Sequence, residues 1–117
     1  MRTSANDEFG KTSSSAKFRH HRLTTLMYTE GIKEMVTACK ATWLLHLILQ
    51  LTDEHDTEKH KRTIWEVMRL REDEFYVFVT DDKGHRLAGE HIKNSNFTYD
   101  EATFWLVDHL LMFPYTM

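Results

Sequence analysis

The chain has 117 residues, with 15 Lys and Arg, 18 Asp and Glu, eight His, one Cys and one Pro. This length fits a single domain, and one thiol excludes an intrachain disulfide framework and a Cys-rich zinc finger. The longest apolar run, residues 41–51, is about half a membrane span and is interrupted by His46 and Gln50. We therefore expect a globular cytoplasmic domain that makes no contact with a membrane.

The net charge of −3 is unevenly distributed along the chain. Residues 1–27 hold five basic and two acidic side chains, a net of +3, and the remaining 90 residues carry −6. The first 17 residues are polar and rich in Ser and Thr, so they offer little apolar surface to bury. The composition predicts a flexible basic leader over residues 1–17 and a single domain over residues 18–117.

A helical pattern of apolar residues begins after Thr29, a residue type suited to the N-cap of a helix. Its apolar positions recur at intervals of three and four residues: Ile32, Met35, Val36, Cys39, Trp43 and Leu47. From residue 41 onward the pattern is apolar nearly all round, which is typical of a helix buried on several sides. The spacing predicts one long buried helix over roughly residues 30–51, with His46 and Cys39 as core side chains.

Three segments rich in β-forming residues follow, over residues 63–70, 75–80 and 86–92. Their short connections, the second with Gly84 in a hairpin turn, predict antiparallel neighbours. Gly89 indicates a bulge or close packing. Strand alternation places Met68 and Leu70 on one face, and Tyr76 would mark an interface if its face is exposed.

The last part of the chain contains two short elements. Thr98 and Glu101 have the spacing of a capping box, which predicts a short helix to about residue 107. Residues 110–113 then predict a final buried strand before Pro114. The fold class is α+β: a three- to four-stranded antiparallel sheet packed against one long buried helix, in the order α-β-β-β-α-β.

Several short motifs resemble those of a small uncharacterised family found in bacteria, phages and mobile elements. Residues 28–31 (Tyr-Thr-Glu-Gly) and 43–45 (Trp-Leu-Leu) resemble its Tyr-Thr-Asp-Gly and Trp-Leu-Leu-Asp motifs. Further similar stretches follow the family's order, at residues 18–20, 64–67, 97–101 and 110–114. His46 stands where the family has an acidic residue, and residues 114–117 depart from its Pro-Ser-Glu-Tyr ending. The resemblance implies the same element order with a final strand, and it implies no activity.

The absence of catalytic motifs, the acidic domain and the resemblance together predict a non-enzymatic accessory protein of a phage or mobile element, without a cofactor. We expect it to bind and inhibit a host protein complex, with an anti-CRISPR protein acting on a CRISPR effector as the most concrete case. Acidic surfaces can complement a partner's Lys and Arg side chains. The predicted contact residues are Asp53, Glu54, Asp56, Glu58, Asp81 and Asp82.

Two alternatives use other residues. A metal-binding protein, with zinc as the metal, would use His20, His21 or His46, although the sequence has no His-Glu-x-x-His pair. A weak nucleic-acid-binding regulator would use Lys17, Arg19 and Arg22, although the net acidic charge makes direct contact with nucleic acid the less favoured interpretation.

Overall fold

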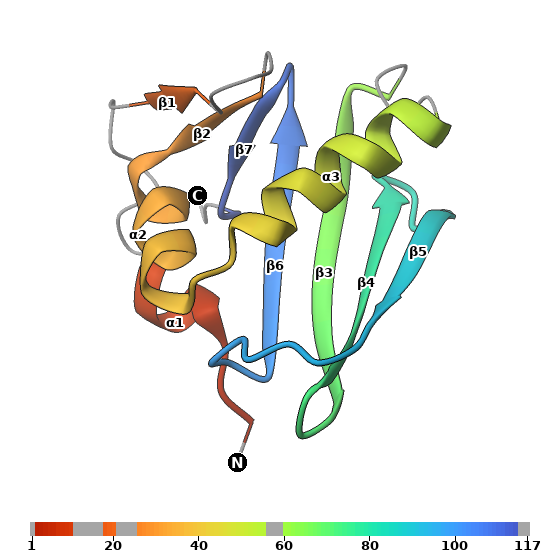
Figure 1. Ribbon diagram of the computed structural model, residues 1–117. Coiled ribbons are helices and arrows are strands. Elements are labelled where there is room, and N and C mark those ends of the chain that lie inside the picture. The colour runs from red at the N-terminus through yellow and green to blue at the C-terminus, as the bar shows by residue number, and fades with distance from the viewer. Residues whose placement is uncertain (1, 11–17, 21–25, 56–59, 115–117) are drawn as a thin grey trace.

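The computed structural model describes residues 2–10, 18–20, 26–55 and 60–114, and shows one sheet with helices on one face (Figure 1). The helices are α1 (Ala5–Phe9), α2 (Glu30–Cys39) and α3 (Thr42–His55). The strands are β1 (Phe18–His20), β2 (Met27–Thr29), β3 (Arg62–Arg71), β4 (Glu74–Asp81), β5 (Arg86–Ile92), β6 (Glu101–Val107) and β7 (Leu110–Met112). The sheet has seven strands in the order β1-β2-β7-β6-β3-β4-β5.

The α+β class is confirmed, but the sheet is larger than the three or four strands predicted, and it is mixed. Strand β2 pairs with β7 in parallel, whereas the other neighbouring strands are antiparallel. The predicted order α-β-β-β-α-β is therefore wrong. Strands β1 and β2 have three residues each, which is too short for alternation to reveal them.

The three central predicted strands are confirmed as β3, β4 and β5, which pair as antiparallel neighbours. The turn between β4 and β5 places Gly84 at φ 87°, in the left-handed region that glycine adopts without strain. Gly89 is explained by close packing, because a Cβ atom there would collide with the hydroxyl group of Tyr76. The final predicted strand is confirmed as β7.

The single helix predicted over residues 30–51 is two helices. Lys40 adopts φ 52°, and the Ala41 N–H then donates to the Val36 carbonyl at 2.9 Å, an arrangement that ends α2. Ala41 is fully buried at the bend. Apolar residues therefore continue from α2 into α3, and their spacing alone does not show that the helix is broken. Thr29 is the N-cap residue of α2, but its side chain makes no capping hydrogen bond. Within the described helices, none alone is long and apolar enough to cross a membrane, and α2 with α3 reaches that threshold only as a pair bent by 119°.

Lys40 carries a left-handed conformation that costs a residue with a Cβ atom about 1 kcal/mol. We therefore expect Lys40→Gly to raise the free energy of unfolding by about 0.5–1 kcal/mol in urea denaturation. Ala38→Gly, at an exposed helical position in α2, is the matched control and should lower it by about 1 kcal/mol. A destabilising Lys40→Gly would contradict the left-handed cap.

The helix predicted over residues 98–107 is wrong, because residues 101–107 form the central strand β6. Strand β6 pairs with β3 over seven registered residue pairs and with β7 over three. Its side chains alternate, with Ala102 and Phe104 buried and Thr103 and Trp105 half-buried. The strand is thus stabilised by pairing on both edges, which outweighs the local capping signal at Thr98.

The predicted flexible leader is ordered over residues 2–10. Ala5 is fully buried, and the Ser4 hydroxyl caps α1. The Asn6 amide donates to the Thr103 carbonyl at 2.9 Å and accepts from the Thr103 N–H at 2.8 Å. Asn6 therefore occupies part of the β6 edge that β7, paired only with residues 105–107, leaves open. Residues 11–17 lie outside the described residues, so the boundary at residue 17 stays a prediction.

The core lies between the sheet and the helices α2 and α3. Trp65, Val67, Phe75 and Val77 point to this side from β3 and β4, and each is fully buried. Their alternate neighbours point to the opposite face of the sheet, which no described helix covers (Figure 1). Among the described elements, this second sheet face therefore has no helix packed on it.

Candidate functional site

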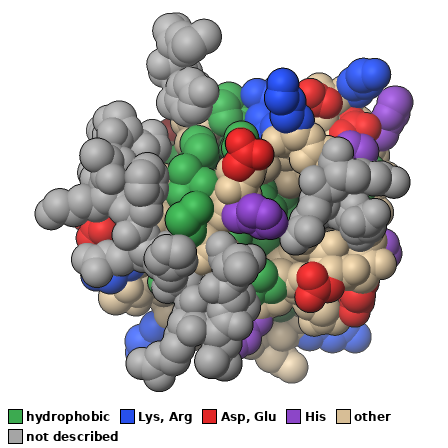
Figure 2. Space-filling view, turned by 90° about the horizontal axis from the view of Figure 1, so that it is seen from above, with side chains coloured by type: hydrophobic (Ala, Val, Ile, Leu, Met, Phe, Trp, Pro, Cys, Tyr) green, Lys and Arg blue, Asp and Glu red, His purple; other side chains and the backbone are tan. Residues whose placement is uncertain are grey.

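The predicted acidic contact residues that the structure describes lie on two elements, the end of α3 and the turn after β4. Asp53 and Glu54 are exposed at the end of α3, where Glu54 accepts a hydrogen bond from Gln50 at 3.0 Å. Asp82 is exposed in the turn after β4, and Asp56 and Glu58 lie outside the described residues. Figure 2 shows acidic, basic and His side chains interspersed over the upper face. A contact through Asp53, Glu54 and Asp82 stays a prediction.

Asp81 orders the hairpin turn, which its low exposure of 8% reflects. Its Oδ1 accepts from the backbone N–H groups of Lys83 and His85, both at 2.9 Å, and its Oδ2 lies 3.2 Å from His85 Nδ1. The backbone hydrogen bond from His85 is the main cause that lowers the pKa of Asp81, with the Lys83 hydrogen bond and the His85 ring adding to it. Asp81 is therefore a turn-forming residue whose oxygens are already used.

The lowered pKa of Asp81 predicts a pH-dependent stability. A carboxyl group whose folded pKa is lowered stabilises the fold above its ordinary pKa, and this stabilisation is lost as the pH falls through the folded pKa. Wild type should therefore be more stable than Asp81→Asn from pH 7 to about 5, and the difference should shrink below about pH 4. Urea denaturation across this range measures it. Asp82→Asn, at the exposed neighbour, should change little, and a wild-type advantage that persists at low pH would contradict the assignment.

Three of the six basic and histidine residues of the two alternative hypotheses lie in the described structure: Arg19, His20 and His46. Arg19 and His20 lie in β1, whereas Lys17, His21 and Arg22 lie outside the described residues. His46 is exposed on α3, so its prediction as a core residue is wrong; the helical period turns Leu45 and Leu47 inward and residue 46 outward. No group of three or more His, Cys, Asp or Glu among the described residues could hold a metal ion.

Cys39 is a core residue, as predicted. Its side chain is 3% exposed and hydrogen-bonds with Thr98. Burial raises the pKa of the Cys39 thiol, so the group stays protonated and unreactive at neutral pH.

The sheet face opposite the helices carries apolar side chains on neighbouring strands. Pairing places Ile64 beside Trp105 and Met68 beside Tyr76. Met68 is 41% exposed, a high degree for a large apolar side chain. Leu70 is 54% exposed and lies at the margin of this face, at the register irregularity between Arg69 and Arg71. A sheet face in contact with water ordinarily carries polar side chains, so this composition is typical of an interface.

Two arginine side chains lie over aromatic rings of this face. The Arg62 guanidinium lies 4.6 Å from the centre of the Trp105 ring, and that of Arg86 lies 4.4 Å from Phe78 and 5.5 Å from Tyr76. Neither forms an ion pair with another described residue, and the buried Arg62 Nε has no hydrogen-bond partner there. We call the following set the uncovered face: Arg62, Ile64, Met68, Leu70, Tyr76, Phe78, Arg86 and Trp105.

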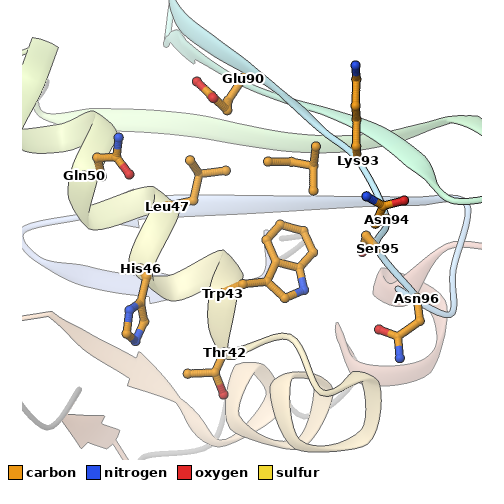
Figure 3. Close-up of a pocket in the computed structure, with 11 residues that line it drawn as sticks. Thr42, Trp43, His46, Leu47, Gln50, Glu90, Lys93, Asn94, Ser95 and Asn96 are labelled. Carbon is orange, nitrogen blue, oxygen red and sulfur yellow. The ribbon is translucent and has the colours of Figure 1, made fainter.

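A groove is the second feature of interest, and it lies on the helix side of the sheet. It has a volume of about 640 Å³ and runs between α3, the end of β5 and the loop at residues 93–96 (Figure 3). Its lining residues are Thr42, Trp43, His46, Leu47, Gln50, Glu90, Ile92, Lys93, Asn94, Ser95 and Asn96. Sequence reasoning missed this groove, because Trp43 and Leu47 fit the core pattern equally well.

A model described as a family of unknown function (DUF6876) matches residues 3–116. No curated protein and no solved structure matches the chain. The match confirms the resemblance to an uncharacterised family, and it extends into the ordered residues before β1. The chain belongs to this family of unknown function.

Proposed function

We propose that the chain is a non-enzymatic protein-binding domain that docks a partner protein on its uncovered face. The observation that carries the proposal is the exposure of Met68, which pairs with Tyr76 on a sheet face that no described helix covers. Exposed apolar groups of this size on a sheet face are typical of protein–protein interfaces.

The composition of the uncovered face indicates the chemistry of the partner. Trp, Tyr and Arg are the residue types that contribute most binding energy at interfaces. The guanidinium groups of Arg62 and Arg86 are held on aromatic rings and form no ion pair with described residues, so each can receive a carboxylate from the partner. The proposed partner surface is therefore apolar with acidic side chains at its margin.

Nucleic acid fits this face less well than protein. The rings that would stack on bases are already covered by guanidinium groups. Glu66 shares the face with Met68 by alternation in β3, and Glu74 shares it with Tyr76 by alternation in β4, so the two arginines are offset by two carboxylates. Glu101, opposite Met68, is ion-paired with Arg2 at 3.3 Å. A face without excess positive charge gives little affinity for phosphates.

The identity of the partner and the effect of binding stay predictions. The family resemblance favours a host defence complex, with inhibition as the outcome. The predicted acidic contact implies a basic partner surface, whereas the uncovered face implies an acidic one. These two interpretations can be separated by experiment.

A photo-crosslinking amino acid is placed at position 70, on the uncovered face, and in separate proteins at position 53 on α3 and position 34 on α2. Each protein is exposed to an extract of cells that encode the chain, and the crosslinked partner is identified, purified and titrated. We expect crosslinking from position 70. Arg86→Glu should weaken binding of the purified partner about tenfold or more, and Asp53→Lys less than about twofold.

Three outcomes would overturn the proposal. Crosslinks only from position 53, with Asp53→Lys the more damaging substitution, would assign the contact to the acidic residues. Crosslinks to a second copy of the chain would assign the uncovered face to self-association. The absence of any crosslink from position 70 would show that no partner protein docks on the uncovered face.

A further inference from the structure

We infer that the groove between α3 and β5 binds an extended peptide, which adds to the sheet as a new strand beside β5. The site lies on the helix side of the sheet and at its edge, so it is separate from the uncovered face and does not rest on the proposed function. The argument combines an open strand edge, an apolar wall beside it and a preformed shape.

Strand β5 ends the sheet, and its outer edge pairs with no strand of the described chain. It is regular for five consecutive residues, because Ala88 to Ile92 pair in unbroken register with Val79 to Phe75 and the irregularity falls before Ala88. The strand contains no proline that would remove a donor. An edge of this kind presents N–H and C=O groups that an extended peptide can pair with.

The groove lies where alternate side chains of such a peptide would fall. Glu90 and Ile92 lie on the same side of β5 as the buried Ala88, and both line the groove. Figure 3 shows Trp43 and Leu47 of α3 on the other side of the groove, with the loop at residues 93–96 beyond Trp43. A residue of the added strand facing this side would therefore enter a space between Ile92 and the helix.

The side chains that line the groove favour a bound peptide with one apolar residue flanked by polar residues. Trp43, Leu47 and Ile92 offer apolar contact. Glu90 and Lys93 are exposed at the rim and form no ion pair within the described residues. One charge of each sign at the rim favours a peptide with a charged group of each sign beside its apolar residue.

The groove is preformed, which reduces the entropic cost of binding. Trp43 rests edge-on against Phe97, with ring centres 6.4 Å apart. Phe97 is 1% exposed, and the Ser95 N–H donates to the Asp73 carbonyl at 3.0 Å, which ties the loop to the β3–β4 hairpin. The walls are thus fixed by contacts outside the groove.

The test uses fluorescent nonapeptides in which Thr alternates with one apolar residue type, Val, Ile, Leu, Phe, Tyr or Trp, with Lys and Asp at the ends in either order. At least one should bind the full chain with a Kd of about 10–100 μM. In an added strand, the N–H groups of every second residue point toward β5 and the others point away from it. Methylating the nitrogens of one of these two alternating sets should abolish binding, and methylating the other set should change the Kd less than about twofold.

If the two methylated sets of peptides bind with equal affinity, the peptide does not pair with β5 as a strand. The groove would then bind side chains or small molecules alone, and the inference would be overturned. The absence of binding below about 1 mM by any of the peptides would also overturn it.

Two variants and a matched control locate the site. Ile92→Thr keeps a β-branched residue and should weaken binding about tenfold, and Gln50→Trp, placed at an exposed helix position, should fill the groove and block it. Leu70→Thr, on the uncovered face, should leave peptide binding unchanged and weaken only the protein partner. Unchanged peptide affinity in both Ile92→Thr and Gln50→Trp would overturn the inference. Because Leu70→Thr alters only the uncovered face, its effect on partner binding tests the proposed function separately.

Discussion

Arg69→Ala is expected to lower the free energy of unfolding by about 3 kcal/mol, the order of effect for breaking a partly buried charged network. The Arg69 side chain is 23% exposed. Its Nη2 donates to the carbonyls of Phe97 at 3.0 Å and Tyr99 at 3.3 Å, and its Nη1 donates to that of Glu72. Truncation of Arg69 leaves these carbonyl groups without their hydrogen-bond donor. The loop between β5 and β6, which contains Phe97 and Tyr99, then loses its attachment to β3.

The effect should reach the first residues of the chain through Asp100. Asp100 Oδ1 accepts from Arg69 Nε at 2.8 Å, and its Oδ2 accepts from the Thr3 N–H at 2.7 Å. The Thr3 backbone hydrogen bond, followed by Arg69, lowers the pKa of Asp100. The N–H groups of Asp100 and Glu101 donate to the Thr3 carbonyl, so their hydrogen exchange should accelerate in Arg69→Ala.

Two further variants make this prediction specific. Arg71→Ala removes an exposed arginine from the same strand and should change stability by less than about 0.5 kcal/mol in urea denaturation. Arg69→Lys keeps the charge but cannot donate in a planar fork, so it should restore only part of the loss. Equal effects of Arg69→Ala and Arg71→Ala would refute the network.

Phe97→Ala is expected to cost about 3–5 kcal/mol, the usual range for truncating a buried phenylalanine. Phe97 is 1% exposed and contacts three rings edge-on: Phe75 at 5.7 Å, Tyr99 at 6.3 Å and Trp43 at 6.4 Å. The cavity would therefore open directly beneath one wall of the groove. Stability and the shape of the groove should be lost together.

The matched control is Phe113→Ala, a fully buried ring packed on Phe104 at 5.5 Å and outside the groove lining. Both variants should lose similar stability, but only Phe97→Ala should shift the NMR signal of the Trp43 indole N–H. Phe97→Leu should recover most of the stability. A shift of the Trp43 signal in both variants would show that it reports general loosening rather than the contact with Phe97.

The segments that the sequence predicts well are those in which local and tertiary preferences agree. Strands β3, β4 and β5 combine alternation with a glycine-containing turn, so their existence and pairing follow from the residues. The break between α2 and α3 falls at Lys40, and the sequence has no glycine there that would predict the end of a helix. The Thr98 to Glu101 spacing satisfies a helix-capping rule, yet pairing with β3 and β7 decides the outcome for residues 101–107.

The uncovered face and the groove could be predicted only in part. Alternation alone places Met68 and Leu70 together and makes Tyr76 a potential interface marker, but which face the helices cover depends on the packing of α2 and α3. The stacking of Arg86 on Phe78 requires the β4–β5 register. The groove joins residues from α3 with those at 90–96, and no local pattern connects segments so distant in sequence.

The hydrogen bonds between Asn6 and Thr103 have a practical consequence for handling the protein. Because this side chain substitutes for a strand, a chain shortened by ten residues would expose the backbone of β6 in the middle of the sheet. An exposed edge of this kind promotes aggregation. Truncations that remove Asn6 therefore carry a solubility cost.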